Sequence, residues 1–272
     1  MMTLIWLRVA LVCYAAGLLY ALVALTRTSE ILGKIALHAS YLGMVFHFVS
    51  LTEAVVQTGQ FASASVHNSE SLLAFLVMVV FMIAYMVYKT TTPGIVIFPL
   101  VFLLTFVAAT GQQPLVFASV AAKHGWLFVH ILMIFTGYAA LFLSFGASIL
   151  YLMQERALKS KGASGMFSRL PALQVIDEIG YRSLMIGFPF MTLGLIAGSV
   201  VAESTYGSIN FFDPKILLSV LMWAVYLLMV FTRLNAGWRG RRAALLASVA
   251  FVAAIVAWIS NYFSGMHRFI AS

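Results

Sequence analysis

The stretch WLFVHILMIFTGYAALFLSFGASILYL, residues Trp126–Leu152, contains no Asp, Glu, Lys or Arg. A helix of this length can cross a lipid bilayer with some tilt. The rest of the chain has the same character, since 63% of all residues are hydrophobic and only 9% are charged. A water-facing globule of this composition would expose a largely apolar surface and would aggregate. The sequence therefore predicts an integral membrane protein.

Charged and turn-forming residues divide the chain into eight apolar runs, each close to the length that spans a bilayer. We expect an all-α, polytopic membrane bundle of about eight transmembrane helices, forming a single integral membrane domain over residues 1–272. The expected spans are Leu4–Leu25, Ile31–Leu51, Leu72–Tyr88, Pro93–Ala109, Trp126–Leu152, Ser183–Ala202, Ile216–Phe231 and Ala243–Phe263.

Charge placement predicts how these spans are oriented. If the amino terminus is outside, the outer loops hold only Lys123, Lys215 and Arg268 of the sixteen Lys and Arg residues. Arg8 lies within the first span, and all the others fall in inner loops. The positive-inside rule therefore predicts that both termini are outside. The basic run from Trp238 to Arg242 is then a topology anchor beside anionic lipid headgroups, and the net charge of +8 requires no nucleic-acid partner.

The histidines are the strongest candidates for functional residues in this sequence. His130 lies about one turn inside the outer end of the fifth span, and His267 follows the outer end of the last one. The two bracket the outer loop at residues 203–215. His47 is an ionisable group within the second span, which makes it a functional candidate, although a hydrogen bond to a neighbouring helix explains it equally well. His67 and His124 are expected to be satisfied by headgroups or water.

Haem suits two outward-facing histidines better than a hydrophilic metal ion does. A metal ion would require more ligands, often carboxylates, which are scarce in the outer loops, whereas haem requires one or two axial side chains and an aromatic slot. The loop offers Tyr206, Phe211 and Phe212 as that surface. Asp213 is expected to cap the helix that begins at the following proline. Other acidic residues, Asp177, Glu178 and Glu203, are expected to be solvated loop charges.

The stretch YGSINFFDPK, residues Tyr206 to Lys215, resembles the "WWD" segment of the CcsA/ResC/CcmC cytochrome c assembly proteins, typically W-G-x-x-W-x-W-D-P-K. The glycine and the Asp-Pro-Lys ending are kept, and every tryptophan is replaced. Further stretches resemble the same family in order and spacing. They are Glu70-Ser71-Leu72, Trp126 to Tyr138, Gly187-Phe188-Pro189 with Thr192-Leu193-Gly194, Trp223 to Arg233, Gly237 to Ala243, and Gly265-Met266-His267.

The resemblance implies a haem-binding protein of cytochrome c biogenesis in a bacterial-type inner membrane, with its site on the periplasmic side. His130 and His267 occupy the places of the two axial ligands of haem b, bound without a covalent link. Tyr206, Gly207, Phe211, Phe212 and Asp213 belong to the loop beside them. His47 matches the family's early intramembrane histidine. The implied partners are haem, a ResB-like subunit, apocytochrome c and the lipid bilayer.

The departures from the family pattern keep two alternatives open. Phe231 stands where the family has a second intramembrane histidine, and with the lost tryptophans this is similar to the HemX/YpjD-like branch. A HemX-like regulator or scaffold of haem synthesis, without haem delivery, is therefore one alternative. A small-solute transporter is the other, indicated only by Gly and Pro in the sixth span. In enzymatic terms, the chain would be at most a component of a cytochrome c synthetase (haem lyase).

Overall fold

The computed structural model describes residues 2–27, 29–58, 66–110, 125–160, 170–207 and 211–259. Within these ranges the chain forms eight α-helices and no strand, as the composition predicts. The helices are α1 (Met2–Arg27), α2 (Glu30–Thr58), α3 (Val66–Tyr88), α4 (Gly94–Thr110), α5 (Gly125–Lys159), α6 (Leu173–Tyr206), α7 (Pro214–Leu234) and α8 (Arg241–Ile259).

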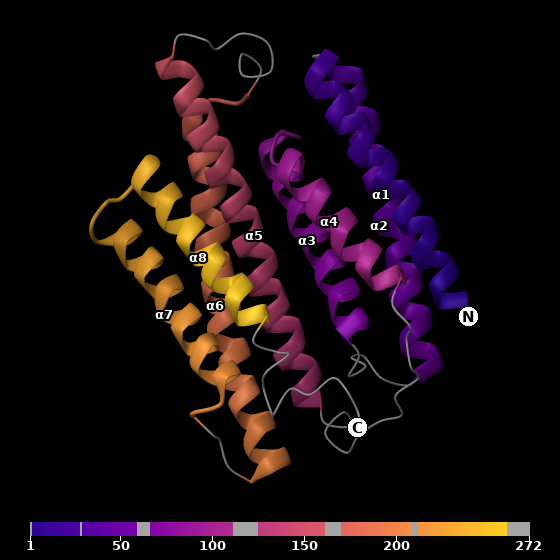
Figure 1. Ribbon diagram of the computed structural model, residues 1–272, viewed down its shortest axis with the longest axis vertical. Helices are drawn as coiled ribbons and strands as arrows, with labels where there is room; N and C mark the ends of the chain where they lie inside the picture. The colour runs from indigo at the N-terminus through magenta and orange to yellow at the C-terminus, as the bar shows by residue number, and fades with distance from the viewer. Residues whose placement is uncertain are drawn as a thin grey trace.

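Consecutive helices run in opposite directions (Figure 1). α1, α3, α5 and α7 begin at one end of the bundle, drawn at the bottom of the view, and α2, α4, α6 and α8 begin at the other. This alternation is what a chain that crosses a membrane repeatedly requires.

Among the described residues, six helices are long and apolar enough to span a membrane, namely α1, α2, α3, α5, α6 and α7, and α4 is a shorter apolar helix. The faces that they turn outward are apolar as well. Val12 on α1 is 68% exposed, Ile31 on α2 71% and Leu193 on α6 54%. Such surfaces are stable only in contact with lipid. The chain is therefore a multi-pass membrane protein.

The most extensive helix pair in the described part of the bundle is α5 with α6, and its packing depends on glycine. A Cβ atom at Gly137 of α5 would meet the Met191 backbone of α6 at 3.2 Å, and one at Gly187 of α6 would lie 2.8 Å from Cβ of Ala140. Helices in lipid associate through such close van der Waals packing, because lipid provides no hydrophobic force between them. The α5 and α6 helices therefore lie in close contact where these glycines face the neighbouring helix.

Several helices extend beyond the apolar runs from which they are expected, and α5 and α6 are the examples nearest the site. α5 continues to Lys159, and α6 begins at Leu173, soon after Pro171. A helix satisfies its backbone hydrogen bonds internally, so it continues past the apolar segment until the chain turns. α6 is also helical throughout despite Pro189. The broken midplane helix that a transporter interpretation requires is thus not present among the described residues.

Candidate functional site

His130 lies near the start of α5 and turns toward α6. Its Nδ1 atom is 2.7 Å from the backbone carbonyl oxygen of Gly194. A carbonyl oxygen only accepts hydrogen bonds, so Nδ1 carries the proton in this contact. The lone pair of the neutral ring is then on Nε2. Metal-bound histidines share this pattern, in which one ring nitrogen donates to a carbonyl group and the other faces the metal.

Glycine makes room for the His130 ring on the surface of α6. A Cβ atom at Gly198 would lie 2.6 Å from both Cε1 and Nδ1 of His130, which is closer than real Cβ contacts occur. One turn away, a Cβ atom at Gly194 would lie 2.7 Å from the side chain of Ile134. Residues 194 and 198 thus form a glycine groove that holds the i, i+4 pair His130 and Ile134. The imidazole is held by shape as well as by its hydrogen bond.

The loop between α6 and α7 lies at the same end of the bundle as the start of α5 (Figure 1). Gly207 ends α6 with φ of 72°, a left-handed conformation natural to glycine, and its N–H donates to the Glu203 carbonyl over 2.9 Å. Phe211 and Phe212 follow, 65% and 86% exposed. Two of the three aromatic residues expected to form a surface on this loop are therefore exposed.

Asp213 closes the loop and is buried, with 6% of its surface exposed. α7 begins at the next residue, Pro214, and the Asp213 carbonyl accepts the first hydrogen bond of the helix, from Leu217 N–H over 3.0 Å. Asp213 therefore occupies the N-cap position that the sequence predicts. An acidic residue there is also favoured by the helix dipole.

Several predicted site residues fall outside what the structure describes. His267 and His124 lie beyond the described ranges, and for Tyr206, Lys215 and His67 only the backbone is described. The pairing of His130 with His267 stays a prediction. The loop also extends past the level of His130, because α6 continues for about 12 Å beyond Gly198 at the usual helical rise.

His47 is fully buried between α1, α2 and α3. Its Nε2 atom is 2.9 Å from the Ser71 hydroxyl, and its Nδ1 atom is 3.4 Å from the Tyr14 hydroxyl. The Phe75 ring packs edge-on against the imidazole. Both nitrogens thus contact hydroxyl groups, which is the hydrogen-bonding explanation left open for this residue. Phe231, at the place of the second intramembrane histidine, is 55% exposed on α7.

The expectation for Asp177 as a solvated loop charge is wrong. It lies in α6, and its Oδ1 atom is 3.0 Å from a guanidinium nitrogen of Arg233, whose side chain is only 7% exposed. Glu178 is helical too, and pairs on the surface with Arg182. Buried ionisable groups in a membrane protein are costly, so they usually have partners and often have functions. Pro171, which precedes α6, is the sequence signal that could have indicated this helical start.

Among the described residues, no three His, Cys, Asp or Glu side chains gather as ligands for a bare metal ion. The site that the described residues do define is one imidazole held at a helix interface, with an exposed aromatic loop at the same end of the bundle. Together with the helices around it, this is a multi-pass membrane protein with a histidine held between two helices near one end of the bundle.

Comparison with known proteins identifies the family. The family model described as Cytochrome C assembly protein matches residues 64–267. The chain is also 24% identical to the cytochrome c biogenesis protein CcsA of Guillardia theta, over 98% of this chain and 94% of that protein. It is 29% identical to the CcsA protein of Heterosigma akashiwo over 74% of each chain. The chain belongs to the cytochrome c assembly protein family.

Some of these matches are partial. The alignment with the CcsA protein of Prochlorococcus marinus, at 30% identity, covers 54% of this chain and 53% of that protein. The chain thus spans about half the length of that relative. The family match includes α3 to α8, and therefore both the His130 groove and the α6–α7 loop.

Proposed function

We propose that this protein acts in cytochrome c biogenesis as a single membrane domain that binds haem b without a covalent link. His130 ligates the iron, with His267 as the second axial ligand. The observation that carries the proposal is the His130–Gly194 contact, because it protonates Nδ1 and leaves the ligating lone pair on Nε2. Family membership supports the same conclusion.

The α6–α7 loop provides the surface for the macrocycle. Phe211 and Phe212 are exposed there, and Tyr206 and Gly207 stand at the start of the loop, where α6 ends. Asp213 fixes the end of the loop to α7. A porphyrin requires an apolar, aromatic environment, whereas its propionates require the headgroup zone. Lys215 and Arg268 are the cations that this proposal assigns to them.

The site faces the periplasmic side of a bacterial-type inner membrane in this proposal. The connections at the opposite end of the bundle carry the basic residues of α1–α2, α3–α4, α5–α6 and α7–α8, among them Arg27, Lys89, Lys159 and Arg241. The positive-inside rule places that end in the cytoplasm. Both chain termini and the His130 end are then outside, where c-type cytochromes mature.

Haem supplies the vinyl groups to which the cysteines of an apocytochrome are joined. The contribution of this chain is to bind and orient the cofactor, so the protein is a synthetase component or chaperone more than a conventional enzyme. Apocytochrome c and a ResB-like subunit are the partners that complete such a system. They would approach the exposed Phe211 and Phe212 at the outer end.

A regulatory role, as in HemX-like proteins, is the second candidate. It is favoured by Phe231, which is exposed and non-ligating at the position of an intramembrane histidine. A regulator that senses haem would bind it at His130 but would not deliver it. Deletion of the gene separates the two roles, because delivery requires that c-type cytochromes be lost, whereas regulation predicts normal maturation with altered haem synthesis.

Absorption spectra of the protein purified in mild detergent test the proposed ligands. We expect a Soret band in the wild-type protein, and the loss of most of it in both His130→Ala and His267→Ala. His38→Ala is the matched control, since His38 is exposed on α2 at the other end and bonds only locally to the Lys34 carbonyl. A Soret band of full size in His130→Ala would overturn the proposal.

A further inference from the structure

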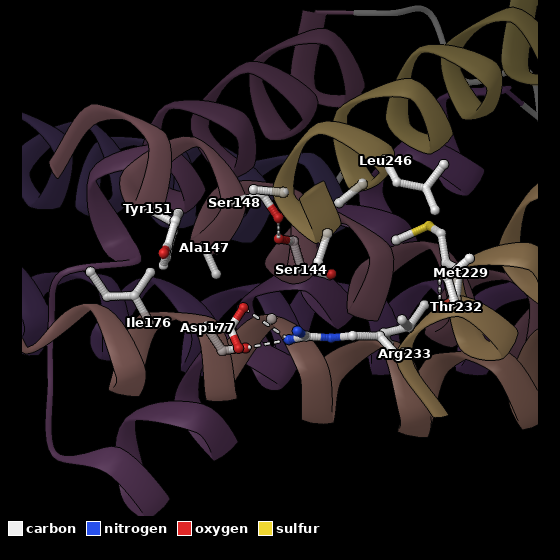
Figure 2. Close-up of a pocket in the computed structure, with 15 residues that line it drawn as sticks. Ser144, Ala147, Ser148, Tyr151, Ile176, Asp177, Met229, Thr232, Arg233 and Leu246 are labelled. Carbon is white, nitrogen blue, oxygen red and sulfur yellow. Dashed lines mark hydrogen bonds and ion pairs between the residues drawn. The ribbon is translucent and has the colours of Figure 1, made fainter. Parts of the chain in front are cut away.

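A partly buried ion pair lies at the end of the bundle opposite His130, with the Arg233 side chain 7% exposed and the Asp177 side chain 22% exposed. The Arg233 guanidinium, on α7, contacts Oδ1 of Asp177 on α6 and also donates to the Asp177 backbone carbonyl, over 3.0 and 3.1 Å (Figure 2). A further hydrogen bond, of 2.9 Å, goes to the Trp238 carbonyl in the α7–α8 turn. The Tyr181 ring lies 5.2 Å from the guanidinium carbon. Arg233 therefore joins α7 to α6 and to the turn.

The same carboxylate holds the start of α8. Oδ1 of Asp177 accepts a hydrogen bond from the Gly240 N–H over 3.1 Å. Gly240 has φ of 60°, and a Cβ atom there would lie 2.6 Å from the Tyr151 hydroxyl on α5. A residue with a side chain would be strained in this conformation and would collide with that tyrosine. α5, α6, α7 and α8 thus converge within one small cluster, which we name the inner lock: Tyr151, Asp177, Arg233 and Gly240.

The inner lock borders a small cavity of about 20 Å³, enough for about one water molecule. Ser144, Ser148 and Thr232 line it, and the Asp177–Arg233 pair lies along its side (Figure 2). A cavity this small does not hold a larger ligand. The described partners of the ion pair are the Gly240 N–H, the Trp238 carbonyl and the Tyr181 ring.

A buried ion pair is poor evidence for stability, because removing two charges from water costs about as much as their attraction returns. Its better-attested use is to fix the register of the elements that it joins. The inner lock joins four helices whose opposite ends carry the candidate haem site. α5 and α6 carry His130 and its groove, α7 begins at Pro214 directly after Asp213, and the sequence that follows α8 contains His267.

We propose that Arg233 and Asp177 are positioning residues, which fix the α7–α8 hairpin on the α5–α6 pair and so align the aromatic loop with His130. The helices transmit this register because they are stiff over their length. The expected effect on haem binding rests on the proposed function. The expected effect on the relative positions of the helices is independent of it, so the two effects can be tested separately.

Distances between spin labels at the outer end test the positioning directly. The labels are attached to cysteines at Trp126 on α5 and Leu217 on α7, both exposed, after replacement of the single cysteine by Cys13→Ser. We expect one narrow distance distribution in the otherwise wild-type chain and a shifted or broadened one in Arg233→Gln and in Asp177→Asn. An unchanged distribution in these two variants would overturn the proposal.

Arg182→Gln is the matched control. It removes an Arg–carboxylate pair one turn further along α6, in which both side chains are well exposed, at 60% and 40%. Exposed pairs of this kind contribute little, so the distance distribution should stay as in the wild-type chain. If Arg233→Gln does not fold, the same distance is measured in Arg233→Lys. This variant keeps the positive charge but loses the planar guanidinium fork, so a shifted or broadened distribution is again expected.

Haem retention in the same variants, without labels, tests the link to function. We expect the Soret band of Arg233→Gln to fall by about tenfold, because groups that orient metal ligands change affinity on that scale. The Soret band of Arg182→Gln should equal that of the wild-type protein. A wild-type protein that binds no haem, together with a shifted distance in Arg233→Gln, would refute the proposed function and support the positioning role. A shifted distance with full haem binding would refute the alignment of the site.

Discussion

Replacing Gly187 with leucine is expected to disrupt the centre of the bundle. A Cβ atom at this position would collide with the Tyr226 hydroxyl and lie 2.8 Å from Cβ of Ala140, and Tyr226 is fully buried. Neither α5 nor α7 can withdraw without losing its own packing against α6. Overpacking of this kind costs about 3 kcal/mol of folding free energy. Thermal unfolding in detergent should therefore begin at a markedly lower temperature.

Gly33→Ala on α2 is the control for this prediction. A Cβ atom there would meet only the Thr91 hydroxyl, at 4.0 Å. Exchange of a helical glycine for alanine in open space stabilises a helix by roughly 0.5–1 kcal/mol, so the two variants should change stability in opposite directions. Equal stability of Gly187→Leu and the wild-type chain would show that α5, α6 and α7 are not packed as described.

Replacing Gly198 with alanine is expected to abolish most haem binding with a smaller cost in stability. The added methyl group would lie 2.6 Å from Nδ1 and Cε1 of His130, so the ring has to leave the groove and its hydrogen bond to the Gly194 carbonyl is lost. The stability cost of one such hydrogen bond and a local shift is about 1–2 kcal/mol. The ratio of Soret absorbance to protein measures the expected loss.

Gly125→Ala, at the start of α5, is the control at the same end of the bundle. Nothing lies within 4 Å of a Cβ atom there. Haem content should be unchanged by this substitution. If Gly198→Ala retained as much haem as Gly125→Ala, the groove would not be what orients the His130 ring.

The architecture could be predicted because lipid imposes a simple rule on sequence. Every backbone polar group within the membrane has to be satisfied inside its own helix, so apolar runs such as Trp126–Leu152 translate directly into helices. All eight expected spans overlap a helix of the structure. The helix ends were less predictable. The apolar run of the sixth helix was expected to begin at Ser183, whereas α6 begins at Leu173 and therefore includes Asp177.

Only part of the candidate site could be predicted from the sequence. The sequence predicts that a histidine, His130, lies about one turn inside the end of the fifth span. Its hydrogen bond to the Gly194 carbonyl could not be predicted, because the two residues are 64 positions apart. Nothing in the local sequence of either helix indicates that contact, since it depends on how α5 and α6 cross. The same holds for the Asp177–Arg233 pair and for the two hydroxyl groups beside His47. Long-range packing decides all three.

Imidazole rescue of His130→Gly tests the central claim most directly, because it asks whether a ring nitrogen at that position holds the iron. The account predicts that His130→Gly, purified in detergent, has little Soret absorbance, and that free imidazole restores it during reconstitution with haem. His38→Gly should bind haem without added imidazole. A His130→Gly protein that binds as much haem as the wild-type chain in the absence of imidazole would contradict the account.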